Sequence, residues 1–268
     1  MGEYLYRYIS FEAFVGMIQE KSLTFVLPEL WDDPKEGSAF KHLISSMEHN
    51  YKQVIFSTMY YKTYAQCWTM LSESDAMWRI YSFNNRAVQI KVSKEKLKAL
   101  PDVKMIPVEY SDQFDVDTTN LTEIEDIYNA FLQSLAMKRC AFEHEKEVRL
   151  IRPYIFQDDD DIKKHYDAFR ALVGVFNEED NQGIEILESM YPGQSPKDKA
   201  ENVMKLLNLG SDKQNTLDIP FDNISGFIAG VKVHPLSPDW YASIVKEYCT
   251  RNNLPFDGRS TLYSKADE

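Results

Sequence analysis

The chain has 268 residues, and its 42 Asp and Glu against 30 Lys and Arg give a formal net charge of −12. This length and an even spread of apolar residues predict one domain over residues 1–268. The acidic balance, with no basic block, excludes general nucleic-acid binding. No apolar run approaches the roughly 20 residues that span a bilayer, and the first ten residues lack a secretory signal pattern. We therefore expect a cytoplasmic protein without a membrane segment.

The cysteines and histidines give no sign of a metal centre. Cys67, Cys140 and Cys249 are far apart and odd in number, which favours reduced thiols over a disulfide framework. The five histidines have no Cys or His partner at zinc-ligand spacing. The run of four aspartates at residues 158–161 is typical of a solvated loop. We expect no metal.

The first 27 residues predict a strand, a helix and a second strand. Residues 3–10 alternate aromatic and aliphatic side chains, and Arg7 falls among the aliphatic ones. Ser10 suits the N-cap of a helix that runs to Gln19, and residues 23–27 return to an extended pattern. A charge on the apolar face of a strand needs a physical reason.

The rest of the chain mixes helical and extended patterns. Helices are predicted at 38–50, 74–81, 93–100, 121–138 and 238–253, and strands at 54–61, 66–69, 87–92, 103–110, 224–233 and 259–263. Between 163 and 209 the pattern is almost entirely helical, which predicts a helical insertion. Together these elements predict an α+β fold, in which a mixed or antiparallel sheet is flanked by helices.

Residues 137–156 carry the strongest candidate for a functional site. The end of a predicted helix leads into an extended segment in which Glu145 and Glu147 share one face with Arg149. Charged side chains on a buried face must be paired, so most strands avoid such a cluster. It is either a functional site or a solvent-facing strand with an ordinary Glu147–Arg149 ion pair.

Aromatic residues in the middle of the chain allow two interpretations. Trp68, Trp78 and Tyr81 can simply fill the core, because aromatic side chains bury large apolar areas. Beside Arg79 and Arg86 they can instead stack on a base or a nicotinamide ring.

Several short motifs together resemble a bacterial family catalogued as a domain of unknown function, family 2971. The resemblance runs nearly end to end and rests on residues 5–10 (Leu-Tyr-Arg-Tyr-Ile-Ser), 31–36 (Trp-Asp-Asp-Pro-Lys-Glu), 67–69 (Cys-Trp-Thr), 77–81 (Met-Trp-Arg-Ile-Tyr), 142–149 (ending Glu-Lys-Glu-Val-Arg) and 228–230 (Ile-Ala-Gly). It implies an uncharacterised bacterial protein, and it does not supply an activity.

The chain is also similar, at the level of the fold, to ADP-ribosyltransferases. These enzymes open with strand, helix, strand and a basic or His residue on the first strand, and they close the pocket with a Glu, often as Glu-x-Glu. The similarity implies NAD as substrate, Arg7 on its phosphate or ribose, and Trp78 and Tyr81 beside the nicotinamide. The resulting candidates are Glu147 and Glu145 as catalytic residues, and Arg7, Tyr8, Trp78, Tyr81 and Arg149 as ligand-binding residues.

Two hypotheses from different classes follow. The first is an enzyme that binds NAD or a related nucleotide and transfers or hydrolyses ADP-ribose, as a toxin or a phage-defence effector. The second is a non-catalytic domain that binds a small ligand or a protein, with the Glu and Arg residues as a structural network. A metal-dependent nuclease is disfavoured, because the chain lacks a basic track for phosphates. The sequence does not indicate an oligomeric state.

Overall fold

The protein is represented by a computed structural model. The structure describes residues 3–33, 35–36, 51–113, 124–176, 181–210, 213–221 and 224–264. The strands are β1 (Tyr4–Ser10), β2 (Ser22–Val26), β3 (Tyr64–Thr69), β4 (Ala87–Ser93), β5 (Lys104–Pro107), β6 (Glu109–Tyr110), β7 (Met137–Lys138), β8 (Glu147–Arg152), β9 (Thr216–Pro220), β10 (Ile228–Val233) and β11 (Phe256–Arg259).

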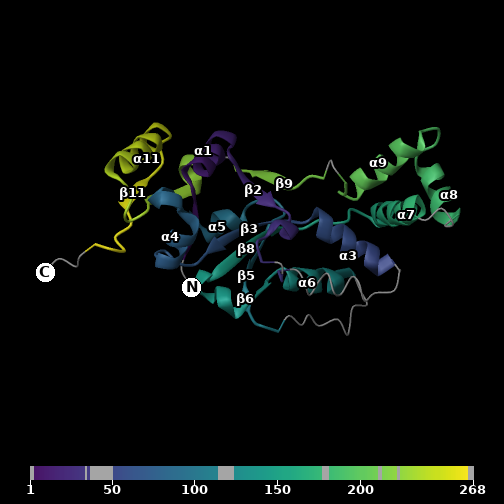
Figure 1. The fold of residues 1–268 in the computed structure, drawn as a ribbon, viewed down its shortest axis with the longest axis horizontal. Helices are drawn as coiled ribbons and strands as arrows, with labels where there is room; N and C mark the ends of the chain where they lie inside the picture. Colours follow the sequence, from purple (N-terminus) through teal and green to yellow (C-terminus); the bar gives the residue numbers. More distant parts are fainter. Residues whose placement is uncertain are drawn as a thin grey trace.

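The helices are α1 (Phe11–Glu20), α3 (Tyr51–Lys62), α4 (Asp75–Tyr81), α5 (Lys94–Lys98), α6 (Ile124–Ser134), α7 (Asp159–Phe176), α8 (Asn181–Met190), α9 (Pro196–Leu206), α10 (Ile224–Phe227) and α11 (Asp239–Arg251), with short 3₁₀ turns η1 (Pro28–Leu30), η2 (Phe83–Asn85) and η3 (Cys140–Glu145). A mixed sheet runs β11-β10-β4-β1-β3-β2-β9, and β8 joins β3 to β5 (Figure 1). The predicted α+β fold is confirmed.

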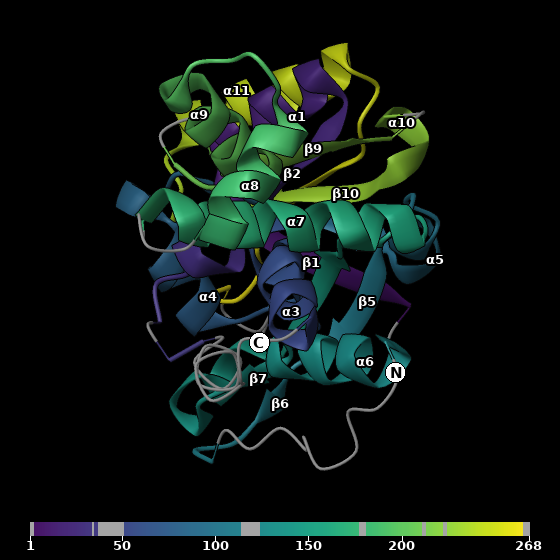
Figure 2. The same cartoon turned by 90° about the vertical axis from the view of Figure 1, so that its right-hand side faces the viewer.

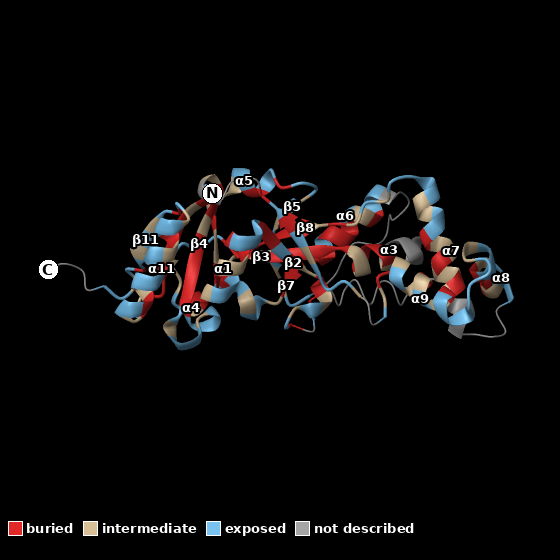
Figure 3. Ribbon diagram, turned by 90° about the horizontal axis from the view of Figure 1, so that it is seen from above, coloured by how far each residue is buried: buried red, intermediate tan, exposed pale blue. Residues whose placement is uncertain are grey.

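The sheet is covered by helices that bury its apolar side chains. Leu5 and Ile90 from the strands meet Phe14 of α1 and Val245 of α11 in the main core, and α1 and α11 lie together on one side of the sheet (Figure 2). Figure 3 shows that β4 and the strands around β3 and β8 are largely buried. Helix α1 begins as predicted, because the Ser10 hydroxyl accepts a hydrogen bond from the Ala13 amide at 3.1 Å.

Some predicted elements are wrong. Residues 54–61, predicted as a strand, belong to helix α3, which packs with α6 through Met59 and Phe131. The helix predicted to reach residue 138 ends at Ser134, and the chain then forms the short strand β7. The last strand lies at Phe256–Arg259 rather than at 259–263. The helix predicted at 38–50 lies outside the described residues.

The predicted helical insertion is present as α7, α8 and α9, which gather at the end of the molecule opposite α11 (Figure 1). They enclose a small core of their own, built from Ala168, Ala171, Leu187 and Val203. Among the helices of the described segments, none is long and apolar enough to cross a membrane.

Strand β3 has one fully paired edge and one largely open edge. It pairs with β8 along its whole length, from Tyr64 to Thr69. On its other edge it meets β1 only at Thr69 and β2 only at Ala65. Strands β1 and β2 therefore diverge beside the middle of β3, where Cys67 lies, and this divergence positions the candidate site.

Candidate functional site

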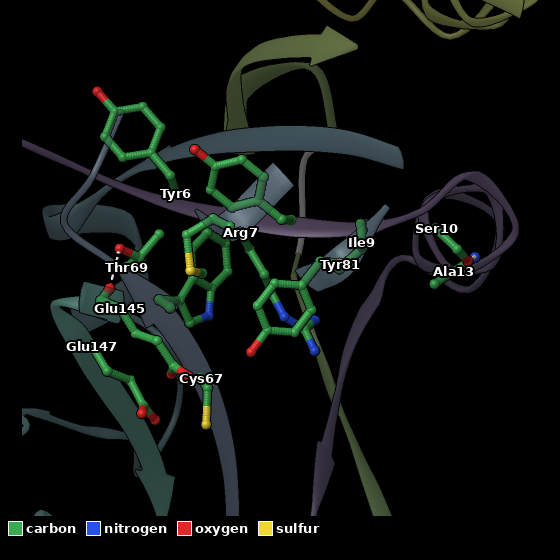
Figure 4. Close-up of a pocket in the computed structure, with 13 residues that line it drawn as sticks. Tyr6, Arg7, Ile9, Ser10, Ala13, Cys67, Thr69, Tyr81, Glu145 and Glu147 are labelled. Atoms are coloured by element: carbon green, nitrogen blue, oxygen red, sulfur yellow. Dashed lines mark hydrogen bonds between the residues drawn. The ribbon is translucent and has the colours of Figure 1, made fainter. Parts of the chain in front are cut away.

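A pocket of about 280 Å³ opens where β1 leaves β3 (Figure 4). Its polar lining residues include Arg7 from β1, Cys67 and Thr69 from β3, Tyr81 from α4, and Glu145 and Glu147 around the start of β8. The structure therefore brings Arg7, from the first motif, close to Glu145 and Glu147, which lie far away in the sequence. Five of the predicted site residues line this pocket, namely Arg7, Tyr8, Tyr81, Glu145 and Glu147.

A second cavity of about 680 Å³ adjoins the pocket. The two share Cys67, Tyr81 and Glu145 as lining residues. The second cavity is further lined by Trp31 and Phe142, and by charged residues from several segments: Asp32, Asp33, Glu36, Lys138 and Arg139. A ligand that fills the pocket thus has room to extend past Glu145.

Glu147 is ion-paired at both carboxylate oxygens. Its Oε1 accepts a hydrogen bond from Arg149 Nε at 2.7 Å, and its Oε2 accepts one from Lys138 Nζ at 2.9 Å. The residue is only 2% exposed. Burial alone would raise the pKa of Glu147, but the charges of Arg149 and Lys138 outweigh it and lower that pKa to about 2. Glu147 is therefore an ionised carboxylate at neutral pH.

Lys138 on β7 holds three carboxylates at once. Its Nζ lies 2.7 Å from Glu145 Oε2, 2.9 Å from Glu147 Oε2 and 3.3 Å from Glu36 Oε1. Lys138 is not among the predicted site residues, because the sequence pattern places it at the end of a long helix. The sequence does contain a signal for it, because Lys138 lies in the same short stretch as Glu145 and Glu147 and can pair with them.

Arg149 pairs with Glu147 and Glu36 from inside the core. The residue is completely buried, and it pairs with Glu36 Oε2 at 2.7 Å and donates to the Leu135 carbonyl at 2.6 Å. Its guanidinium also lies 4.0 Å from the centre of the Trp31 ring. Arg149, predicted as a ligand-binding residue, is not among the residues that line the pocket and instead contacts Glu147 from the core side.

Backbone contacts fix the two glutamates at the start of β8. Lys146, between them, has the left-handed φ of 43°, which turns the chain from η3 into the strand. The Thr69 hydroxyl donates to the Glu145 carbonyl at 2.5 Å, and the Glu147 amide donates to the Tyr110 hydroxyl at 2.7 Å. Glu145 and Glu147 are therefore held side by side around Lys138.

Arg7 lies on the β1 wall of the same pocket. Figure 4 shows its guanidinium beside the Tyr81 ring. Within the described ranges of the chain, this guanidinium forms no hydrogen bond and no ion pair. Burial lowers the pKa of Arg7, and the residue is half-buried, so the pocket wall holds a cation that is only partly solvated. Such a group is costly unless a counter-charge is supplied.

Two predicted aromatic residues belong to the core instead. Trp78 is completely buried and does not line the pocket; its ring packs edge-on against Tyr8 at 4.7 Å and lies near His234. The structure thus places Trp78 in the core, which is the other of the two interpretations that the sequence allows. Tyr8 lines the pocket but is only 3% exposed, because its ring packs against Trp78. The described residues include no group of three His, Cys, Asp or Glu placed to hold a metal ion.

The lowered pKa of Glu147 predicts how stability depends on pH. Because its folded-state pKa of about 2 is below the ordinary 4.5, its contribution is present above pH 4.5 and is lost as the pH falls toward 2. Each pKa unit corresponds to about 1.4 kcal/mol, so wild type should lose roughly 3 kcal/mol more than Glu147→Gln over this range.

Urea unfolding at several pH values measures this difference. Glu143→Gln is the matched control, because Glu143 pairs with Lys146 at the surface. The control should follow the wild-type profile. Parallel profiles for wild type and Glu147→Gln would show that Glu147 is not held ionised by its partners.

The fold and the site define an α+β protein with a pocket between diverging strands and a buried network of Glu, Lys and Arg behind it. The chain resembles the family described as "Protein of unknown function (DUF2971)", whose model matches residues 77–150. That segment supplies Tyr81, Lys138, Glu145, Glu147 and Arg149, so it contains most of the network. No curated protein and no solved structure gives a significant match.

Proposed function

We propose that the protein binds NAD or a related nucleotide between β1 and β3 and transfers or hydrolyses its ADP-ribose group. One observation carries the proposal: Arg7, a cation with no ion pair among the described residues, shares a pocket with the ionised carboxylate of Glu147. A dinucleotide offers a matching pair of features. Its phosphates suit Arg7, and its ribose suits a carboxylate.

The carboxylate also fits the chemistry of the proposed reaction. When the bond between nicotinamide and ribose breaks, its electron pair leaves with nicotinamide and positive oxocarbenium character develops on the ribose. A negative group beside the ribose stabilises that charge only as it forms. Arg149 and Lys138 keep Glu147 negative for this role. Glu145 lies next to it, where it can orient an acceptor or take its proton.

The sizes of the two cavities fit a ligand that spans both. A pocket of about 280 Å³ is at the lower limit for a small-molecule site. It suits the nicotinamide riboside end of a dinucleotide, while the adjoining cavity of about 680 Å³ offers space for the remainder or for an acceptor. On the same proposal, the biological role is that of a toxin or a phage-defence effector.

Release of nicotinamide from NAD tests the proposal. Wild type should release nicotinamide, and Glu147→Gln should lower the rate by roughly 100-fold or more, the scale on which removing a transition-state electrostatic contact acts. Because Glu147→Gln is also expected to lose stability, the assay is run well below the melting temperature of both proteins, with folding checked by circular dichroism. Equal rates in the two proteins would refute the catalytic role.

A second candidate function is a non-catalytic binding domain. The observation that favours it is that Arg149 and Lys138 engage both oxygens of Glu147, which leaves little of the carboxylate exposed. On this proposal the network only supports the pocket wall, and a small ligand or a protein occupies the pocket. Glu147→Gln would then lower stability, and neither protein would release nicotinamide.

A further inference from the structure

A recess of about 380 Å³ lies between the sheet and the helices α7–α9, away from the candidate site. Its lining comes from the end of α3, the start of β3, the end of β8, the C-terminal part of α9 and the segment that enters β9. The side chains include three cations and two tyrosines, namely Lys62, Arg152, Lys205, Tyr64 and Tyr154. None of the described residues that line it is acidic, in a chain whose net charge is −12.

Lys62 is the most enclosed of the three cations. Its Nζ donates to His165 Nε2 at 3.1 Å and to the Leu206 carbonyl at 3.3 Å, and it lies 4.2 Å from the centre of the Tyr154 ring. Over the described part of the chain no carboxylate comes within ion-pair distance of it. Burial lowers the pKa of Lys62, so a nearby anion would stabilise its charged form.

The other two cations, Arg152 and Lys205, can also pair with an anionic ligand. Arg152 pairs at 3.0 Å with Asp102, but that carboxylate is 56% exposed and therefore largely solvated. Lys205 is exposed near the end of α9, and no ion pair joins it to another described residue. Three positive groups from three elements thus border one recess. Among the described residues, the nearby carboxylates are the solvated Asp102, which pairs with Arg152, and Asp161, whose charge favours the charged form of Lys62 but does not offset its burial.

One wall of the recess is already fixed by hydrogen bonds. Asn208, with the left-handed φ of 55°, donates from Nδ2 to the Tyr61 carbonyl at 2.6 Å and accepts at Oδ1 from the Gln214 amide at 2.8 Å. The Tyr64 hydroxyl donates to the Gln214 carbonyl at 2.9 Å. These bonds tie the segment before β9 to the end of α3. A preformed wall lowers the entropic cost of binding.

We propose that this recess is a second ligand site, which binds a small molecule through a phosphate group placed among Lys62, Arg152 and Lys205. Arg and Lys are the side chains that most often bind phosphate. Arg152 has N–H groups beyond the two that donate to the Pro153 carbonyl and pair with Asp102. The recess is larger than a phosphate ion, so it leaves space for the organic part of the ligand. The site is separate from the pocket at Arg7 and does not depend on the proposed NAD chemistry.

A thermal-shift titration with adenosine 5′-monophosphate tests this site, with adenosine as the uncharged probe and KCl added to constant ionic strength. The nucleotide should raise the melting temperature of wild type and of Arg7→Met alike, and adenosine should not. Lys205→Glu should weaken the response at least tenfold. Lys197→Glu is the matched control, because Lys197 lies on the same helix, is exposed and does not line the recess; it should respond like wild type.

Three results would overturn the proposal. The first is the absence of a shift beyond that of KCl in wild type. The second is an equal response in wild type and Lys205→Glu. The third is a response that Arg7→Met abolishes, since this would place the phosphate in the pocket beside β1. Only the third bears on the proposed function, so failure of the two proposals can be told apart.

Discussion

Replacing Arg149 with Met should lower the free energy of unfolding by about 3–5 kcal/mol, the cost of leaving buried charges unpaired. The guanidinium is completely buried and holds Glu36 and Glu147 at 2.7 Å each. Methionine fills much of the space but supplies no hydrogen bond, so the two carboxylates would keep only Lys138 as a counter-charge. Urea unfolding followed by circular dichroism measures the difference.

A surface pair provides the control for Arg149. Arg79 pairs with Asp75 at 2.9 Å on α4, and both side chains are largely exposed. Arg79→Met should leave the free energy of unfolding almost unchanged, because solvent screens such pairs. If Arg149→Met proved as stable as Arg79→Met, the buried network would not be a main support of β8.

Replacing Arg7 with Met should have the opposite signature, with loss of ligand binding and no loss of stability. Arg7 is half-buried and its guanidinium lacks an ion pair among the described residues, so methionine should leave the melting temperature almost unchanged. Affinity for NAD should fall by about 2–5 kcal/mol, or roughly 30-fold or more, because a buried charge contact to the phosphates is lost. Calorimetry for binding and a thermal melt for stability measure the two effects separately.

Arg7→Lys is the matched variant, because it keeps the charge but loses the planar fork. It should retain part of the affinity that Arg7→Met loses. A large drop in stability in Arg7→Met, with NAD binding unchanged, would assign Arg7 to the scaffold and would remove the observation on which the proposed function rests.

Local patterns predicted the parts of the fold that local forces determine. Strand β1 follows from the alternation of aromatic and aliphatic side chains around Arg7, and helix α1 begins at the Ser10 cap. Both signals are local, because they lie in or directly beside the elements that they predict. Helix α3 was missed because Val54 to Tyr61 mixes β-branched and aromatic residues without a clear period. Helix α3 packs against α6 and α7, which are far away in the sequence, and a local pattern does not show such contacts.

The candidate site was predictable only in part, for the same reason. That Glu145 and Glu147 lie together follows from a spacing of two residues, and the structure confirms the Glu147–Arg149 ion pair, although in a buried rather than a solvent-facing position. The third carboxylate, Glu36, comes from a segment more than 100 residues away. The sequence leaves Trp78 open between core packing and stacking on a ligand, because composition does not show which side of α4 faces the core.

Calorimetric titration of the wild-type protein with NAD is the most direct test of the proposed function. We expect saturable binding with a dissociation constant below about 1 mM, which corresponds to at least about 4 kcal/mol of binding free energy, and we expect Arg7→Met to abolish most of it. Absence of binding at millimolar NAD, or equal binding by wild type and Arg7→Met, would contradict a nucleotide site between β1 and β3.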